Sequence, residues 1–515
     1  MRFVRKAAIP AAALLLTGLA ATPANAVDKV NSKKLRDAVT VNGILGHERV
    51  LQRIANQNGG TRASGTAGHV ASATYVKDTL RAAGYRVSEQ EFTFPFFRDL
   101  APATLTAGSA SYPTDTFTYS GSGTVTGTLV PTTDVQVPPP ATPGVTSGCE
   151  AADFPAAGDA PAVALIQRGT CTFAVKAHNA VAAGYDAVII FNEGQTGRTA
   201  LVTGDLGEVF DIPIVGLGYA DGAALVTAAQ AGPVTVKVST STETDLDATT
   251  TNVLAETPGG DPDRVLVVGA HLDSVVDGPG INDNGSGVST ILEVAKQLSA
   301  LKVKPRQKIR FAFWGAEEGG LLGSEHYVDT LPDADLAKIF ANLNFDMVGS
   351  PNYVRFAYDG DGSAYPGTSG PPGSGEIETI FHDYFTSQGL ASGEKEFNGR
   401  SDYGPFIAVG IPAGGVSSGS DGVKTEAEAA TYGGTAGVIY DPCYHKACDT
   451  IGNVSTKALA ELGDGAAHGI YTLAMTRTGL FPDGSLRAAR AAVAKAPASE
   501  SPSNRPATAL DRIKS

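Results

Sequence analysis

Histidine and acidic residues directly follow three short apolar runs in the second half of the chain, where strands would end. These residues are His271, Asp273, Glu317, Glu318 and Asp346. Continuous apolar runs such as Val265–Gly269 and Ile309–Phe313 are typical of strands that are buried on both faces. In an open α/β sheet, ligands bind at the carboxyl ends of such strands. The sequence therefore predicts one site that gathers these side chains.

Two further motifs could add ligands to this site. Asp283 lies in the glycine-rich turn Gly280–Gly287, and His445 lies in the segment Asp441–Asp449. Each residue alone has a structural interpretation, because an Asp after a strand often caps a helix and adjacent Glu residues usually face solvent. The recurrence at three strand ends favours a metal site instead. Two His and three or four carboxylates suit two zinc ions that share one bridging carboxylate, with another carboxylate left as a base for metal-bound water.

Apolar strands alternate with helices from about residue 252 to residue 480, which predicts an α/β sheet covered by helices. One of these helices is expected over about residues 288–298. Residues 117–238 differ in composition: they are rich in Gly, Thr and Pro, carry short β-branched runs and contain one expected helix over 172–183. The chain therefore holds a second, β-rich unit ahead of the site-bearing one.

The composition excludes several classes of protein. The chain has 515 residues, of which 42% are hydrophobic, and a formal net charge of -14, which makes it unsuited to hold a nucleic-acid backbone. Its first 26 residues combine a basic start, a short apolar stretch and a small-x-small end, as a cleaved signal peptide does. No later run of about 18 apolar residues follows. We therefore expect a secreted protein with no membrane attachment once the signal peptide is removed.

These motifs resemble peptidase family M28, the zinc aminopeptidases, in identity, order and spacing from about residue 252 to residue 480. Arg62–Thr66 resembles the N-terminal part of that family, and Arg168–Phe173 and Ala183–Asn192 resemble a protease-associated (PA) domain. The resemblance implies an α/β zinc exopeptidase fold: a mixed, largely parallel sheet with helices on both faces and an inserted β-rich PA domain. It divides the chain into a signal peptide (1–26), the N-terminal part of the peptidase domain (27–116), the PA domain (117–240), the main part of the peptidase domain (241–482) and a disordered or removable tail (483–515).

The resemblance also implies a set of ligands for two zinc ions. His271 and Asp346 belong to one zinc, and His445 and Glu318 belong to the other. Asp283 bridges the two ions. All five family positions are filled in this sequence, which implies hydrolysis of peptides from a free N-terminus by a metal-bound hydroxide.

Three other residues receive roles from the same resemblance. Glu317 is the general base, and Tyr444 helps to hold the developing oxyanion. Asp273 orients the imidazole of His271, which fixes its tautomer and raises its basicity as a ligand. Arg400 lies near the motifs and is a candidate for substrate binding.

The four cysteines suit two local disulfides in an exported protein. Cys443 and Cys448 would close a short loop around Tyr444 and His445, although a thiolate metal site is an alternative. Cys149 and Cys171 both lie in the inserted unit and would close a loop there.

Two alternatives to a secreted di-zinc aminopeptidase stay open at the level of sequence. The first is a carboxypeptidase or a glutaminyl cyclase on the same fold; a carboxypeptidase needs a cation for the substrate carboxylate, and a cyclase works with one zinc. The second is a non-catalytic binding protein, which should have lost some of the ligands or the base. None of those residues is missing here.

Overall fold

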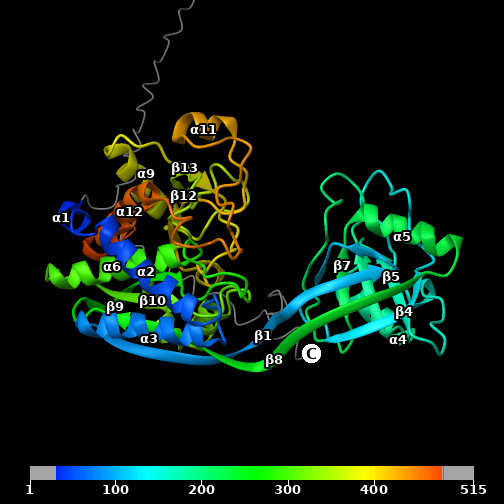
Figure 1. The fold of residues 1–515 in the computed structure, drawn as a ribbon. Helices are drawn as coiled ribbons and strands as arrows, with labels where there is room; N and C mark the ends of the chain where they lie inside the picture. Colours follow the sequence, from blue (N-terminus) through cyan, green and yellow to red (C-terminus); the bar gives the residue numbers. More distant parts are fainter. Residues whose placement is uncertain (1–29, 478–479, 481–515) are drawn as a thin grey trace, which may run out of the picture.

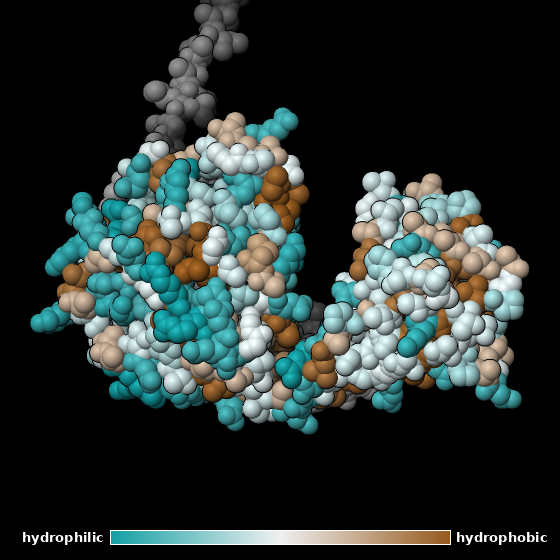
Figure 2. Space-filling model, viewed as in Figure 1, coloured by the Kyte–Doolittle hydropathy of each residue, from teal (hydrophilic) through white to brown (hydrophobic). Residues whose placement is uncertain are grey.

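The computed structural model describes residues 30–477 and 480, and it has two lobes joined by two long strands (Figure 1). The signal peptide predicted over residues 1–26 lies outside the described residues, as does the tail predicted over residues 483–515. Strands β1 (Arg86–Ala107) and β8 (Thr235–Glu256) run antiparallel to each other from one lobe into the other. In Figure 2 the lobes stand apart above these strands.

One sheet of 14 strands passes through both lobes because β8 pairs at each of its ends. Residues 253–256 of β8 pair with β10 (Gln307–Trp314) in the larger lobe, and residues 235–240 pair with β4 (Gly123–Pro131) in the smaller lobe. The order across the sheet is β13-β12-β14-β11-β9-β10-β8-β4-β5-β6-β7-β3, with β1 and β2 (Ala110–Tyr112) beside it.

The larger lobe is built on four parallel strands in the order β14-β11-β9-β10. They are β9 (Asp261–His271), β10, β11 (Ile339–Phe345) and β14 (Ala413–Ser417), and the edge is extended by β12 (Phe356–Tyr358) and β13 (Gly393–Lys395). Strand β12 is antiparallel to β14, so the sheet is mixed but largely parallel, as predicted.

Both faces of this sheet are covered by helices because its strands are apolar on both sides. Along β9, Leu266 and Val268 pack into one core, whereas Val265 and Val267 pack into another. The first core contains residues from α1 (Lys33–Arg36), α2 (Val41–Gln57), α3 (Ala67–Ala82), α6 (Gly285–Ala300), α9 (Ser374–Ser387) and α12 (Thr456–Met475). The second contains residues from α7 (Leu322–Thr330), α8 (Asp333–Leu336) and α10 (Gly404–Ala408). A further short helix, α11, spans Glu426–Tyr432.

The smaller lobe has two cores of its own, one on each face of its part of the sheet. Its elements are β3 (Thr114–Thr116), β4, η1 (Ala151–Asp153), β5 (Ala162–Gln167), α4 (Phe173–Ala182), β6 (Ala187–Phe191), β7 (Ile214–Leu217) and α5 (Tyr219–Ala231). The domain boundaries at residues 117 and 240 stay a prediction.

The helix expected over residues 288–298 begins earlier, at Gly285. The side chain of Asn284 accepts a hydrogen bond from the backbone N–H of Gly287, which caps the first turn and lets the helix start inside the glycine-rich turn. Among the described residues, no helix is both long enough and apolar enough to cross a bilayer.

Candidate metal centre

His271 is the last residue of β9, and its side chain is almost completely buried. Its Nε2 atom lies 3.1 Å from Oδ1 of Asp283 and 3.4 Å from Oδ1 of Asp346. Asp346 follows β11, the neighbouring parallel strand, so the two strands bring both residues to the same edge of the sheet. This is the arrangement that the strand-end pattern predicts.

His445 lies near the other carboxylate oxygen of Asp283. Its Nε2 atom lies 3.2 Å from Oδ2 of Asp283 and 3.1 Å from Oε2 of Glu318. The two oxygens of Asp283 therefore face two different imidazoles. The structure thus brings together all five residues that the sequence analysis named as ligands, in the pairs that the analysis named.

The glycine-rich turn fits closely against the loop that carries Asp346. A Cβ atom at Gly287 would lie 2.1 Å from the carbonyl oxygen of Phe345, so a larger residue would push these segments apart. The side chain of Asn284 ties them together, since its amide donates to the Phe345 carbonyl and its oxygen accepts from the N–H of Met347. The position of Asp283 relative to Asp346 is therefore fixed by backbone contact.

Glu317 lies beside the ligands, with its Oε2 atom 3.9 Å from Nε2 of His271. Burial raises the pKa of Glu317 well above its usual value, and the carboxylates of Asp402, Glu318 and Asp346 raise it further against the opposing effect of His271. A raised pKa makes the carboxylate a stronger proton acceptor, which suits a general base.

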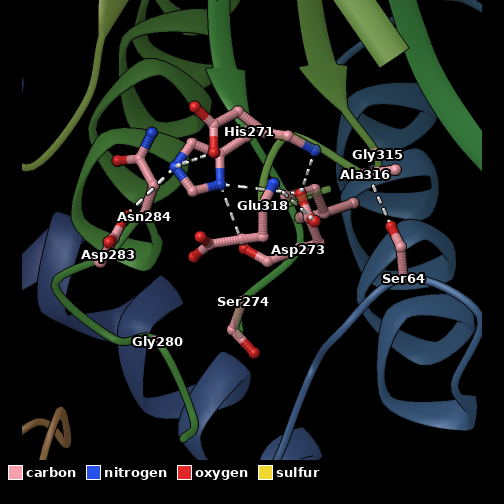
Figure 3. A network of polar contacts seen from close by, with 12 residues as sticks. Ser64, His271, Asp273, Ser274, Gly280, Asp283, Asn284, Gly315, Ala316 and Glu318 are labelled. Carbon is pink, nitrogen blue, oxygen red and sulfur yellow. Dashed lines mark hydrogen bonds and ion pairs between the residues drawn. The ribbon is translucent and has the colours of Figure 1, made fainter. Parts of the chain in front are cut away.

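Asp273 connects His271 to the loop of the two glutamates. The Nδ1 atom of His271 lies 3.2 Å from the backbone carbonyl of Asp273 and 3.6 Å from its carboxylate. The carboxylate itself accepts the backbone N–H groups of Glu317 and Glu318, at 3.3 and 3.4 Å (Figure 3). The group closest to Nδ1 of His271 is therefore the backbone carbonyl of Asp273, whereas the prediction gave the orienting role to the Asp273 carboxylate.

The electrostatics of the cluster favour a divalent cation. Burial alone would raise the pKa of Asp283, but the imidazoles of His271 and His445 lower it. Burial and the charge of Asp283 raise the pKa of Glu318 to about 7. Burial alone would lower the pKa of His445, but Asp283 and Glu318 raise it to about 10. Such shifts show that the carboxylates outnumber the positive charges that could neutralise them.

The donor set also fits zinc. The Oε1 atom of Glu318 is buried and has no hydrogen-bond partner among the described residues. A buried carboxylate oxygen without a partner is costly unless a ligand takes it up. Imidazole nitrogens and carboxylate oxygens are the usual ligands of catalytic zinc. His271, Glu318 and Asp283 each offer one such atom within 4.8 Å of the others.

The loop with Tyr444 and His445 is closed by a disulfide. Cys443 and Cys448 are bonded, with their Cα atoms 5.3 Å apart, and Cys149 and Cys171 are bonded in the smaller lobe, so both predicted pairs are confirmed. The ring of Tyr444 stacks on that of His445, with centroids 3.8 Å apart.

A pocket of about 340 Å³ opens over the centre. Arg400, the predicted substrate residue, lines it together with Tyr444. Lys395, which was not predicted, also lines the pocket and donates to the hydroxyl of Ser417. A lysine at the end of a short strand, 49 or more residues from each metal ligand in sequence, gives no signal that its side chain faces their pocket.

Two neighbours of Arg400, in the turn of residues 398–402, received no individual role from the sequence. The hydroxyl of Ser401 donates to Oδ2 of Asp346 at 2.6 Å, and this leaves Oδ1 of Asp346 facing His271. Asp402 is fully buried, and burial raises its pKa to about 7. A turn with this many polar side chains was the available signal, but it does not reveal which of them point inward.

Both lobes of the chain are similar to known proteins. Residues 252–470 match the model of "Peptidase family M28", and residues 125–225 match the PA domain. An aminopeptidase of Pseudomonas aeruginosa is 47% identical over 81% of this chain and 78% of its own. A probable leucine aminopeptidase 2 of Aspergillus fumigatus is 41% identical over 82% and 81%. Among solved structures, a zinc aminopeptidase from Bacillus subtilis is 26% identical, with a TM-score of 0.59 over 86% of this chain and 96% of its own.

Proposed function

This chain belongs to peptidase family M28, and from that premise we propose that it is a secreted aminopeptidase with two zinc ions and Glu317 as its general base. Its substrates are the N-termini of peptides or proteins. The proposal rests above all on one observation: the carboxylate of Asp283 lies between two imidazoles, 3.1 Å from His271 and 3.2 Å from His445. Asp346 and Glu318 complete the two sides.

In this proposal His271 and Asp346 hold one zinc, His445 and Glu318 hold the other, and Asp283 binds both. Zinc, when bound, supplies a Lewis acid that lowers the pKa of water and polarises a carbonyl group.

The remaining steps belong to side chains of the chain. Glu317 takes a proton from the attacking water and delivers it to the nitrogen of the leaving amine, so that the carboxyl returns to its starting state. Tyr444 lines the same pocket, and its hydroxyl donates a hydrogen bond to the developing oxyanion. Burial raises the pKa of Tyr444, which keeps that hydroxyl protonated as a donor.

The pocket suits a substrate with a free amine. Asp421, Glu428, Glu394 and Glu396 line it as well as the metal-binding carboxylates. A surplus of negative charge attracts a cationic α-amino group. Secretion is supported by the two disulfides, which persist in oxidising compartments.

The deciding experiment compares leucine p-nitroanilide with the same substrate carrying a blocked amine, since relatives are named leucine aminopeptidases. We expect hydrolysis of the free amine alone, together with two zinc ions per chain by elemental analysis. Equal cleavage of the blocked substrate contradicts an aminopeptidase. One zinc per chain with cyclisation of an N-terminal glutamine supports the cyclase, and release of C-terminal residues supports the carboxypeptidase.

A further inference from the structure

A short segment that contributes no metal ligand contacts two loops of the metal centre. One loop follows β9 and leads to Asp283, and the other follows β10 and carries Glu317 and Glu318. This segment, Thr61–Ser64, precedes α3, and we call it the 61–64 segment. Arg62 within it is completely buried. A buried guanidinium must find acceptors for its five N–H groups, because leaving them unpaired costs several kcal/mol.

The acceptors of Arg62 are backbone carbonyls, not carboxylates. Its Nε donates to the carbonyl of Pro279 at 2.8 Å, and its Nη1 and Nη2 donate to the carbonyls of Leu272 and Gly280. Leu272 follows the ligand His271 directly. Gly280 opens the turn that contains Asp283. One planar group therefore holds the two ends of the loop that separates these two ligands in sequence.

Other groups of the segment strengthen the same connection. The backbone N–H of Arg62 donates to the hydroxyl of Ser274 at 3.0 Å, and the hydroxyl of Thr61 donates to the carbonyl of Val275 at 2.9 Å. Ser274 in turn donates to the carbonyl of Gly278, within the same loop. Figure 3 shows Ser274 and Gly280 below His271 and Asp283.

The other end of the segment reaches the glutamate loop. The hydroxyl of Ser64 accepts the backbone N–H of Ala316 at 2.7 Å (Figure 3). It also accepts a hydrogen bond from the hydroxyl of Thr250 at 2.9 Å. Ala316 immediately precedes Glu317 and has a positive φ of 52°, which is uncommon for a residue with a Cβ. The bond from Ser64 thus holds the loop in a conformation that it would seldom adopt alone.

The positive charge of Arg62 also interacts favourably with carboxylates of the metal centre. Burial lowers the pKa of Arg62 to about 10, and the carboxylates of Asp273, Asp449, Asp283 and Glu318 oppose that change. Arg62 is therefore cationic at neutral pH and lies near four carboxylates. Asp449 also accepts the backbone N–H groups of Asn282 and Asp283, each at 2.9 Å, from the side of the loop with His445.

We propose that Arg62 is a positioning residue of the metal centre, which fixes the separation of His271 and Asp283 through the carbonyls of Leu272, Pro279 and Gly280. Ser64 does the same for Glu317 and Glu318 through Ala316. This inference rests on the proposed function, because it concerns the same zinc ligands. It adds that the centre is preorganised by the 61–64 segment before a metal is bound.

The test measures zinc affinity of the metal-free protein by competition with a chromophoric chelator. Arg62→Met removes all three bonds and the charge, and we expect a loss of zinc affinity of about 10–100-fold, as for other groups that orient metal ligands. With saturating zinc, kcat should fall while KM stays close to the wild-type value, because the pocket walls are unchanged. Arg62→Lys keeps the charge but not the three-carbonyl fork, so its affinity should lie between the two.

Arg355→Met is the matched control. Arg355 is also a buried arginine, which donates to the carbonyl of Ala391 and pairs with Glu461. Its loss should lower the melting temperature without changing zinc affinity. If Arg62→Met does not fold, Ser64→Ala provides the second test, because it removes one acceptor and little volume, and it should lower both zinc affinity and kcat.

Two outcomes overturn the inference. If Arg62→Met or Ser64→Ala loses melting temperature but binds zinc with wild-type affinity and turns over at the wild-type rate, the 61–64 segment is only structural. If zinc affinity and kcat are no higher in Arg62→Lys than in Arg62→Met, and Arg355→Met lowers zinc affinity by the same factor, the effect is general destabilisation. If the wild-type protein binds no zinc, both the proposed function and this inference are refuted. If the wild-type protein binds zinc and the variants bind it equally well, only the inference fails.

Discussion

The two lobes both bury charged side chains at the ends of strands, but they satisfy them differently. In the smaller lobe, Glu193 follows β6 and is completely buried. One of its oxygens accepts the N–H groups of Gly144 and Val145, and the other accepts from Arg198. Those hydrogen bonds outweigh the effect of burial and lower the pKa of Glu193.

In the larger lobe, Glu318 follows β10 with 12% of its side chain exposed, and Asp402 is fully buried in the turn between β13 and α10. Here Oε1 of Glu318 has no hydrogen-bond partner among the residues that the structure describes. Burial raises the pKa of Glu318 and that of Asp402 to about 7. The difference teaches that a buried charge whose lone pairs are all used supports the fold, whereas one with unused lone pairs marks a place for a ligand.

The largest effect is expected at the centre of the larger lobe, when Glu317 is changed to Gln. The variant keeps the volume and the fold but cannot accept a proton, so we expect turnover to fall by about 10²–10⁴-fold, the usual contribution of a general base. Zinc content and melting temperature should stay close to the wild-type values. Loss of zinc together with activity would make Glu317 a ligand, and full activity would remove it from the mechanism.

The residues that could be predicted from the sequence are those with a local signal. His271 and Asp346 each follow a continuous apolar run, and the alternation of Leu266 and Val267 between two cores shows why such a run predicts a central strand. The aminopeptidase fold and the family were predictable for the same reason. The motifs that carry them are continuous in sequence.

The residues that could not be predicted act at long range. The family resemblance at Arg62–Thr66 assigns Arg62 no role, and its three acceptors are more than 200 residues away in the sequence. Ser401 and Lys395 likewise gain their meaning only from partners on other strands. Hydrophobic periodicity gives no information about which polar residue of a loop turns inward.

The two disulfides allow a second test. The Cys443–Cys448 bond closes a short loop that carries His445, and chain entropy assigns it about 2.1 kcal/mol for its sequence separation of 5. The Cys149–Cys171 bond closes a longer one, with about 3.4 kcal/mol for a separation of 22. Replacing the first pair by Ser should therefore cost zinc affinity and activity, and replacing the second should cost mainly stability.

Zinc stoichiometry, turnover and melting temperature on both double variants decide this. The expected loss of zinc affinity for the Cys443/Cys448 variant is about 10-fold or more, as for other changes that loosen a ligand. A large fall in melting temperature with both zinc ions retained would show that this bond serves the fold, and the distinction between the lobes would then fail for covalent links.

A smaller effect is expected at Glu193. Changing it to Gln leaves the N–H groups of Gly144 and Val145 with a weaker acceptor and removes the partner of Arg198. We expect the free energy of unfolding to fall by about 1–3 kcal/mol, the cost of weakening buried hydrogen bonds to a charged group. Urea unfolding measures this, and kcat/KM should not change. A fall in kcat/KM at unchanged stability would link the smaller lobe to catalysis.

The last prediction concerns His468, a half-buried titratable residue of the larger lobe whose contacts are structural. His468 on α12 shares a hydrogen bond with the hydroxyl of Ser32 at 2.8 Å and stacks on Tyr384. Burial and the nearby charge of Arg36 lower its pKa to about 4, below the usual value of about 6.5. The unfolded chain therefore binds a proton at a higher pH than the folded one. Stability is complete above about pH 6.5 and decreases as the pH falls toward 4.

The size of that decrease is about 1–3 kcal/mol, because part of the His468 ring contacts water and solvent screens the charge. The measurement compares urea unfolding at pH 7.5 and pH 4.5 for the wild-type chain and for His468→Gln, which keeps a hydrogen-bonding side chain but cannot titrate. Carboxylates also titrate in this range, so the difference between the two proteins is the quantity that matters. The wild-type chain should lose more stability than the variant on acidification. If both lose the same amount, His468 does not couple folding to pH, and burial of an ionisable group in this lobe does not by itself predict acid sensitivity.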